Sequence, residues 1–290
     1  MTDALQPRSV LRRHPAHRDD IGDLVTRRPV PGPGIEQIDP FLFLNHHGPQ
    51  TYPPNNRGLP FGPHPHRGFE TVTFILEGEL AHNDSGGGES IIRAGGVHWM
   101  TAGSGLIHAE LSPESFKRVG GPLEILQLWV NLPARLKMTA PNYIGLQAAD
   151  LPTFRTNDGV AVEPVSGWWL GVDAPIQSLI DIHLAVLRME PGARFESPVA
   201  RGRNVFLYVV RGRVSVGATP VEPWSLVQMD DDGDAVEITA GDEAVVLLGH
   251  AQPIGEPVFS HGPFVMNTRE EIVQAIHDYQ AGRFGPPPSV

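Results

Sequence analysis

Two pairs of residues in this sequence have the types and spacing of metal ligands. His64 and His66 are separated by one residue, and so are His108 and Glu110. On an extended strand, residues two apart project from the same face, so each pair can direct both side chains into one cavity. The intervening residues 67–107 are long enough for several strands to fold back and bring the pairs together. The sequence therefore predicts a four-ligand metal site.

The donor set indicates which metals such a site would take. Imidazole nitrogen and carboxylate oxygen suit borderline divalent metals such as iron, manganese, copper, nickel and zinc. Thiolate chemistry is excluded because the chain has no cysteine. Three neutral histidines and one glutamate leave a divalent ion with a formal charge of about +1, and an octahedral metal keeps open positions for water, dioxygen or a chelating substrate. This favours a catalytic site over a closed structural one.

Glu70 competes with Glu110 for the role of carboxylate ligand. It has the same parity as His66 along the chain, although the segment Arg67-Gly-Phe separates the two residues. Its alternative role is a hydrogen bond to a ligating imidazole or to Arg67 from outside the coordination shell. Mutating Glu70 and Glu110 one at a time separates these possibilities.

Other polar and aromatic residues near the pairs are predicted to be structural. We expect Arg67 to be exposed at a strand end and Trp99 to pack in a core. Adjacent side chains on a strand point to opposite faces, so His46 and His47 are expected on a surface or loop, and His82 in a hairpin. The acidic run 230–234 is predicted to form a turn, because Ala235 stands where a calcium-binding loop requires glycine.

The elements that must position these residues are predicted to be short strands. The chain has 290 residues, 32 Gly and 29 Pro, which favours many strands joined by tight turns and two similar halves rather than one core. Residues 74–80 and 207–214 share a strand, glycine, strand rhythm that indicates a duplication. One helix is expected near the end, where Thr268 and Glu271 have capping-box spacing.

Composition excludes several classes of function. The formal net charge of -11 argues against direct binding of nucleic acid or of an anionic membrane surface. No run approaches the roughly 20 apolar residues that span a membrane, and the first 20 residues lack the apolar core of a secretory signal. The absence of cysteine suits a reducing compartment. We therefore expect a cytoplasmic protein.

Four segments together resemble the pirin family of the cupin superfamily: 64–72, 99–110, 126–132 and 264–272. The resemblance implies an all-β fold of two cupin barrels, which are double-stranded β-helices of jelly-roll type, with a short C-terminal helix. Residues 1–135 would form the barrel with the metal site, and residues 136–290 the barrel without one. By match of motif, the ligands of a single iron ion would be His64, His66, His108 and Glu110.

The resemblance also implies a function. Some members of the family resemble quercetin 2,3-dioxygenases, which open a flavonol ring with dioxygen, and others are described as regulators. We expect a metal-dependent dioxygenase acting on a small aromatic substrate and dioxygen, with Glu110 as the catalytic residue that accepts the proton of the flavonol 3-hydroxyl. Iron(II) is the expected metal, and the ligands would also accept Mn, Cu, Ni, Co or Zn. The alternative is a metal-binding regulatory protein that acts through a protein partner.

Overall fold

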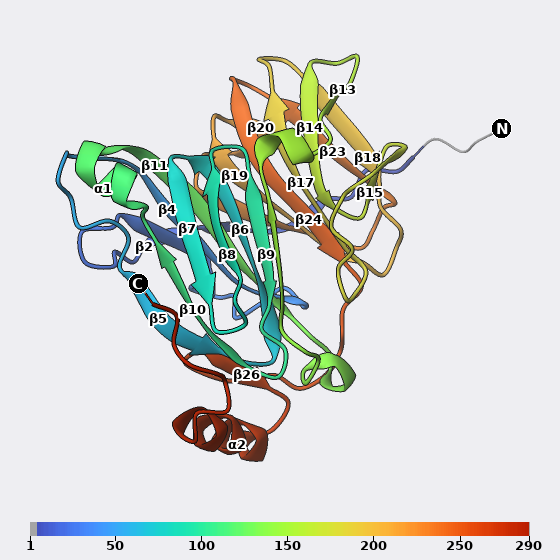
Figure 1. The fold of residues 1–290 in the computed structure, drawn as a ribbon. Helices are drawn as coiled ribbons and strands as arrows, with labels where there is room; N and C mark the ends of the chain where they lie inside the picture. The colour runs from blue at the N-terminus through green and yellow to red at the C-terminus, as the bar shows by residue number, and fades with distance from the viewer. Residues whose placement is uncertain (1–4, 290) are drawn as a thin grey trace. The chain divides into compact units, whose positions relative to one another are not determined.

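The computed structural model describes residues 5–289, which are mostly β-strand and fall into two compact units (Figure 1). Among the described residues, unit 1 comprises residues 5–17, 29–40 and 151–253, and unit 2 comprises residues 18–28, 41–150 and 254–289. Each unit is therefore assembled from separate stretches of the chain, and the division into residues 1–135 and 136–290 stays a prediction. The reason for the separate stretches is strand pairing: β1 (Val10–Pro15) pairs with β22 (Ser225–Met229), which draws the start of the chain into unit 1.

Unit 2 contains a seven-stranded and a four-stranded sheet. The large sheet has the order β12-β9-β6-β11-β4-β3-β2 and the small one β5-β10-β7-β8. The strands of the large sheet are β2 (His17–Arg18), β3 (Thr26–Val30), β4 (Phe41–Tyr52), β6 (Phe69–Glu77), β9 (Val97–Thr101), β11 (Gly121–Asn131) and β12 (Asn142–Leu146). Those of the small sheet are β5 (Phe61–His66), β7 (Glu79–Asp84), β8 (Glu89–Arg93) and β10 (Leu106–Leu111).

An apolar cluster joins the two sheets of unit 2. Ile75 of β6 and Ile125 of β11 come from the large sheet, whereas Leu80 of β7 and Ile92 of β8 come from the small one, and all four are buried together. Phe116 of the short helix α1 (Glu114–Val119) completes this cluster. Burial of such side chains is the main stabilising term for two packed sheets. The sheets therefore face each other, and the polar side chains described below lie between them.

The C-terminal residues 254–290 belong to unit 2 and contain the predicted helix. The hairpin of β25 (Phe259–His261) and β26 (Phe264–Met266) precedes α2 (Arg269–Gln280). The capping box is present: Thr268 Oγ1 accepts from the Glu271 amide at 3.2 Å, and Glu271 Oε2 accepts from the Thr268 amide at 3.0 Å. Each bond satisfies an amide that lacks a helical partner. Among residues 5–289, no helix combines the length and apolarity that crossing a membrane requires.

Unit 1 repeats the two-sheet plan with an apolar interior. Its sheets have the orders β1-β22-β19-β24-β17-β14-β13 and β18-β23-β20-β21, with a separate β15-β16 hairpin. Phe195 and Val236 from the small sheet pack with Leu187 and Leu207 from the large one.

The remaining elements of the chain are η1 (Ala134–Leu136), η2 (Ala148–Asp150), β13 (Phe154–Arg155), β14 (Val160–Ser166), β15 (Trp168–Trp169), β16 (Val172–Asp173), β17 (Ile182–Met189), β18 (Arg194–Pro198), β19 (Asn204–Arg211), β20 (Val214–Val216), β21 (Thr219–Val221), β23 (Ala235–Ala240) and β24 (Ala244–Ala251).

The all-β prediction is confirmed, with one qualification of shape. In the described part of each unit the strands form two facing sheets rather than a continuous hydrogen-bonded barrel. The helix α1, which the sequence did not predict, is only six residues long and lies between β10 and β11.

Candidate metal centre

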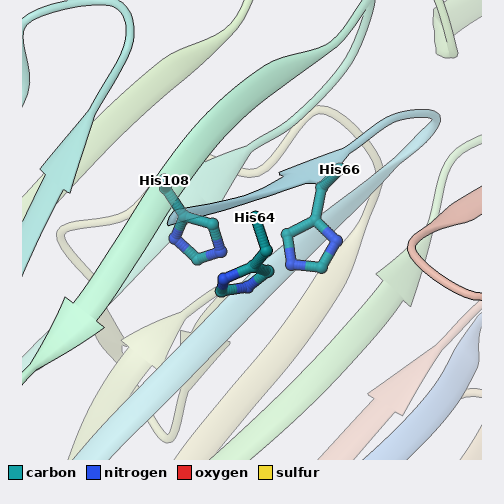
Figure 2. Close-up of side chains that lie close together, drawn as sticks. All are labelled: His64, His66 and His108. Atoms are coloured by element: carbon teal, nitrogen blue, oxygen red, sulfur yellow. The ribbon is translucent and has the colours of Figure 1, made fainter. Parts of the chain in front are cut away.

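Three of the four predicted ligands lie together between the sheets of unit 2. Strands β5 and β10 pair antiparallel, with His108 opposite His64 and Leu106 opposite His66. One ring nitrogen from each of the three histidines lies within 4.8 Å of the others. Figure 2 shows the three rings converging from these neighbouring strands. The alternation of side chains along β5 and the pairing of β5 with β10 are what bring the rings together.

Backbone carbonyl groups fix which ring nitrogens are free. Nδ1 of His64 lies 2.7 Å from the Gly62 oxygen, and Nδ1 of His66 lies 3.3 Å from the Pro263 oxygen. A carbonyl oxygen can only accept a hydrogen bond, so both Nδ1 atoms carry the proton and both Nε2 atoms keep a lone pair. A histidine that binds metal has this arrangement, in which a hydrogen bond from the second nitrogen orients the ring.

His108 provides the test of whether a metal fits. Its side chain is fully buried, and neither ring nitrogen has a hydrogen-bond partner among the described residues. A buried polar atom without a partner is costly, so such atoms need a water or an ion. The free nitrogens of His108 therefore fit a metal ion at the centre of the three-histidine group.

The protonation states favour metal binding. Burial lowers the pKa of His66 to about 3, with a smaller contribution from the neighbouring His64. Burial also lowers the pKa of His108 well below its ordinary value of 6.5. Both rings are therefore neutral near pH 7, and the neutral imidazole is the form that binds a metal.

Glu110 lies beside the three histidines in a cage of hydrogen-bond donors. Its Oε1 accepts from Thr73 Oγ1 at 3.1 Å and lies 2.9 Å from Nε2 of His98, and its Oε2 accepts from Gln127 Nε2 at 2.6 Å. Burial by itself would raise the pKa of Glu110, but the contact with His98 and the interaction with His108 hold it well below its ordinary value. The carboxylate is thus an anion at neutral pH.

The four predicted ligands are not equivalent in this geometry. A bulge interrupts the pairing of β10 with β5 between His108 and Glu110. The group of mutually close ligand atoms contains the three histidines and not Glu110. Coordination by Glu110 therefore stays a prediction, while its charge and its place next to the histidines are features of the structure.

The Glu70 side chain points away from the face of β6 that contacts Glu110. Thr73 of the same strand contacts Glu110, and Glu70 is three residues away along a regularly paired strand, so the two side chains point to opposite faces. Glu70 Oε1 accepts from Thr101 Oγ1 at 2.6 Å, and burial raises its pKa. Strand geometry therefore excludes Glu70 as the competing carboxylate ligand, and its partner is Thr101 rather than a ligating imidazole or Arg67.

His46 and His47, which were expected on a surface or loop, are buried instead and are at most 2% exposed. His82 lies in the hairpin of β7 and β8, as expected, and is also fully buried. The expectation for His46 and His47 was wrong because both faces of β4 are covered, so diverging neighbours are both enclosed. His82 follows the buried Leu80 by two residues on β7, and this alternation is a sequence signal that places His82 on the interior face.

His82 and His98 extend the polar interior beyond the three ligands. The His82 ring stacks on Tyr143 with centroids 4.0 Å apart, and its Nε2 lies 3.0 Å from Asp84 Oδ2. His98 is fully buried and contacts Glu110 as described above, whereas its neighbour Trp99 is buried on the opposite face of β9. The prediction that Trp99 is buried is confirmed.

Arg67 is buried and not exposed as expected. Only 4% of the residue is accessible, and its Nε donates to the Ser104 oxygen at 2.7 Å while Nη1 donates to Asp278 Oδ2 at 2.8 Å. The expectation failed because α2 returns to this position from 211 residues farther along the chain. No local pattern around Arg67 carries that information.

An aromatic surface adjoins the histidines. The Trp129 ring lies 5.3 Å from His66, 4.5 Å from Phe69 and 4.6 Å from Phe43, measured between ring centroids, and it is stacked on Phe43. Its indole Nε1 is buried and has no hydrogen-bond partner in the described chain. Aromatic faces of this kind favour flat, π-rich ligands. Trp129 lies in a segment that marked the family resemblance, but its place beside the ligands was not predicted.

Comparison with known proteins decides the family. Residues 23–130 match the family described as Pirin, and residues 184–285 match the Pirin C-terminal cupin domain. A pirin-like protein of Caulobacter vibrioides is 42% identical over 87% of this chain and 90% of its own length. The chain belongs to the pirin family.

Two further relatives cover most of this pirin-family protein. Pirin of Homo sapiens is 36% identical over 89% of this chain and 87% of its own. The crystal structure of a quercetin 2,3-dioxygenase from Acinetobacter baumannii superposes with a TM-score of 0.90 at 31% identity, covering 97% of this chain and 99% of that one. The predicted family and bicupin fold are thereby confirmed.

Proposed function

We propose that this pirin-family protein is a metal-dependent dioxygenase of flavonol-like aromatics, of the quercetin 2,3-dioxygenase type. The observation that carries the proposal is the group of His64, His66 and His108, in which one ring nitrogen from each residue lies within 4.8 Å of the others. The adjoining aromatic surface around Trp129 and the likeness to the Acinetobacter baumannii quercetin 2,3-dioxygenase support it.

In this proposal the three histidines and Glu110 hold one divalent metal. Iron(II) is the favoured ion, and nitrogen and oxygen donors also accept Mn, Cu, Ni, Co or Zn. When bound, the metal supplies Lewis-acid and redox chemistry for a reaction between an electron-rich aromatic and dioxygen.

Glu110 is the group that accepts the proton of the substrate hydroxyl. Its low pKa keeps it deprotonated, and Thr73 and Gln127 hold its two oxygens in a fixed orientation. The partly buried Trp129 ring, which packs on the fully buried Phe69, orients the flat substrate beside His66. Burial of the carboxylate excludes water and strengthens its electrostatic interactions with the substrate.

The test is turnover of quercetin by iron-loaded protein, followed as loss of visible absorbance together with release of carbon monoxide. We expect turnover by the wild type, loss of both metal and turnover in His108→Ala, and loss of turnover in Glu110→Ala that exceeds any loss of metal. His261→Ala is the matched control, since His261 is exposed in β25. Metal content is measured on each sample. Wild type that holds iron yet leaves quercetin unchanged refutes the proposal for this substrate.

The regulatory alternative uses the same histidines. A protein that retains metal, fails to turn over flavonols and binds a protein partner only when loaded with metal is the outcome that favours it. Elemental analysis of protein purified without added metal identifies the ion in either case.

A further inference from the structure

We infer that the C-terminal segment, residues 259–284, positions the metal ligands through Arg67, so that the site between β5 and β10 is incomplete without it. This inference rests on the proposed role of His64, His66 and His108 as metal ligands. It assigns a function to a part of the chain almost two hundred residues from the first histidine pair.

The first link is to His66 itself. Pro263, in the turn between β25 and β26, provides the carbonyl oxygen that accepts from His66 Nδ1 at 3.3 Å. The same oxygen accepts from the Arg67 amide at 3.3 Å, and the Val265 amide donates to the Arg67 oxygen at 3.0 Å. The C-terminal segment therefore fixes both the tautomer of one ligand and the backbone that follows it.

The second link joins the two ligand strands. The Arg67 guanidinium donates to the Ser104 oxygen from Nε and to Asp278 Oδ2 from Nη1, and it lies over the Phe284 ring at 4.6 Å from the centroid. Ser104 belongs to the turn that leads into β10, which carries His108. One buried side chain thus connects the end of β5, the start of β10 and helix α2. The bond to Asp278 is charge-assisted and partly shielded from solvent, which makes it a strong one.

The third link is close packing at two glycines. A Cβ atom on Gly68 would lie 2.0 Å from the Val265 oxygen, and one on Gly105 would lie 2.6 Å from the Phe284 ring. Lys137 links the same two segments, because its Nζ donates to the Gly68 oxygen at 2.8 Å and to the Val265 oxygen at 3.1 Å. The C-terminal segment is therefore packed against the turn that follows His66 and the turn that precedes His108.

Asp278 is the residue at which this linkage can be weakened selectively. Its Oδ2 accepts from buried Arg67, whereas its Oδ1 accepts from Gln274 and from the exposed Arg283 at 2.8 and 2.7 Å. Asp278→Asn keeps the size of the side chain but removes the charge that Arg67 pairs with. Arg283→Ala removes a partner of the same carboxylate on its exposed side and leaves the Arg67 contact in place, so it is the matched control.

The experiment measures Co(II) binding by chelator competition and the visible absorption spectrum of the Co(II) protein. We expect Asp278→Asn to bind Co(II) about 10- to 100-fold more weakly than wild type, with an altered spectrum, and Arg283→Ala to match wild type. Arg67→Lys is a second variant that keeps the positive charge but cannot bond Ser104 and Asp278 together, and it should show the same loss. Thermal unfolding of each metal-free protein establishes that the variants are folded.

The outcomes separate this inference from the proposed function. Wild type that fails to bind Co(II) overturns the metal site and the inference with it. Wild type that binds Co(II), with Asp278→Asn and Arg67→Lys within about twofold of it and spectrally unchanged, overturns the inference alone. An equal loss in Arg283→Ala also overturns it, because the effect would then come from general weakening of α2.

Discussion

His47 gives a sharp prediction of how stability depends on pH. Its side chain is 2% exposed on β4, Nδ1 lies 2.9 Å from Thr26 Oγ1, and Nε2 is buried without a hydrogen-bond partner among the described residues. Burial lowers the pKa of His47 to about 3 from the ordinary value of 6.5. Between these two pH values the unfolded chain binds a proton at this residue and the folded chain does not. The stability that comes from burying a neutral His47 is therefore fully present at pH values well above 6.5, and it is lost as the pH falls from 6.5 toward 3.

The magnitude follows from one proton. Well below pH 6.5 each pH unit changes the free energy of unfolding by about 1.4 kcal/mol. Because the unfolded His47 is already half protonated at pH 6.5, it accounts for a loss of about 2.3 kcal/mol between pH 6.5 and pH 4.5. In His47→Gln this loss disappears, since the amide does not titrate, and the variant should gain about 2.3 kcal/mol relative to wild type across the interval.

The assay is denaturant unfolding of metal-free protein at a series of pH values from 4.5 to 7.5, with His261→Gln as the control at an exposed histidine. The informative quantity is the difference in the free energy of unfolding between variant and wild type. A difference that stays constant from pH 7.5 to pH 4.5 would refute the argument that His47 is held neutral by burial.

Three further predictions test the site and the fold. Gln127→Leu removes the 2.6 Å donor from Glu110 Oε2 and should raise the pKa of Glu110, measured by infrared titration of the carboxylate; an unchanged pKa would contradict the proposed cage. Phe195→Ala opens a cavity in the core of unit 1 and should lower the free energy of unfolding by about 3 to 5 kcal/mol in denaturant titrations; a loss below 1 kcal/mol would show that this core is not tightly packed. Thr268→Ala deletes the cap of α2 and should cost about 1 kcal/mol, read from hydrogen exchange of the helix amides; unchanged exchange would mean that the capping box contributes nothing.

The sequence by itself determined the local features of this protein. The two pairs spaced by one residue placed each pair on one strand face, because alternation is a property of any extended chain. Turn-rich composition and short β-branched runs gave the all-β class, and Thr268 with Glu271 gave the start of the C-terminal helix. These predictions succeeded because each depends on residues that are neighbours along the chain.

The role of each polar residue near the histidines was decided only by tertiary structure. Because side chains alternate along a strand, Glu70 and Thr73 are expected on opposite faces. Which of the two faces meets the histidines depends on how the two sheets of unit 2 pack. The burial of His47 likewise requires that both faces of β4 be covered. Sequence spacing measures position along a strand, and it contains nothing about the layers that cover that strand.

The return of the C-terminal segment is the clearest case of information that is absent from local sequence. Arg67 was expected at the surface, yet Asp278 and Ser104 enclose it, and Pro263 orients His66. These contacts form because residues 254–289 fold back onto the rest of unit 2, where Phe264 and Ile272 are buried in one cluster with Ile107 of β10. The spacing of the two residue pairs thus predicted where a metal would bind, whereas the free energy of burying a distant apolar segment decided which residues surround His66 and Arg67.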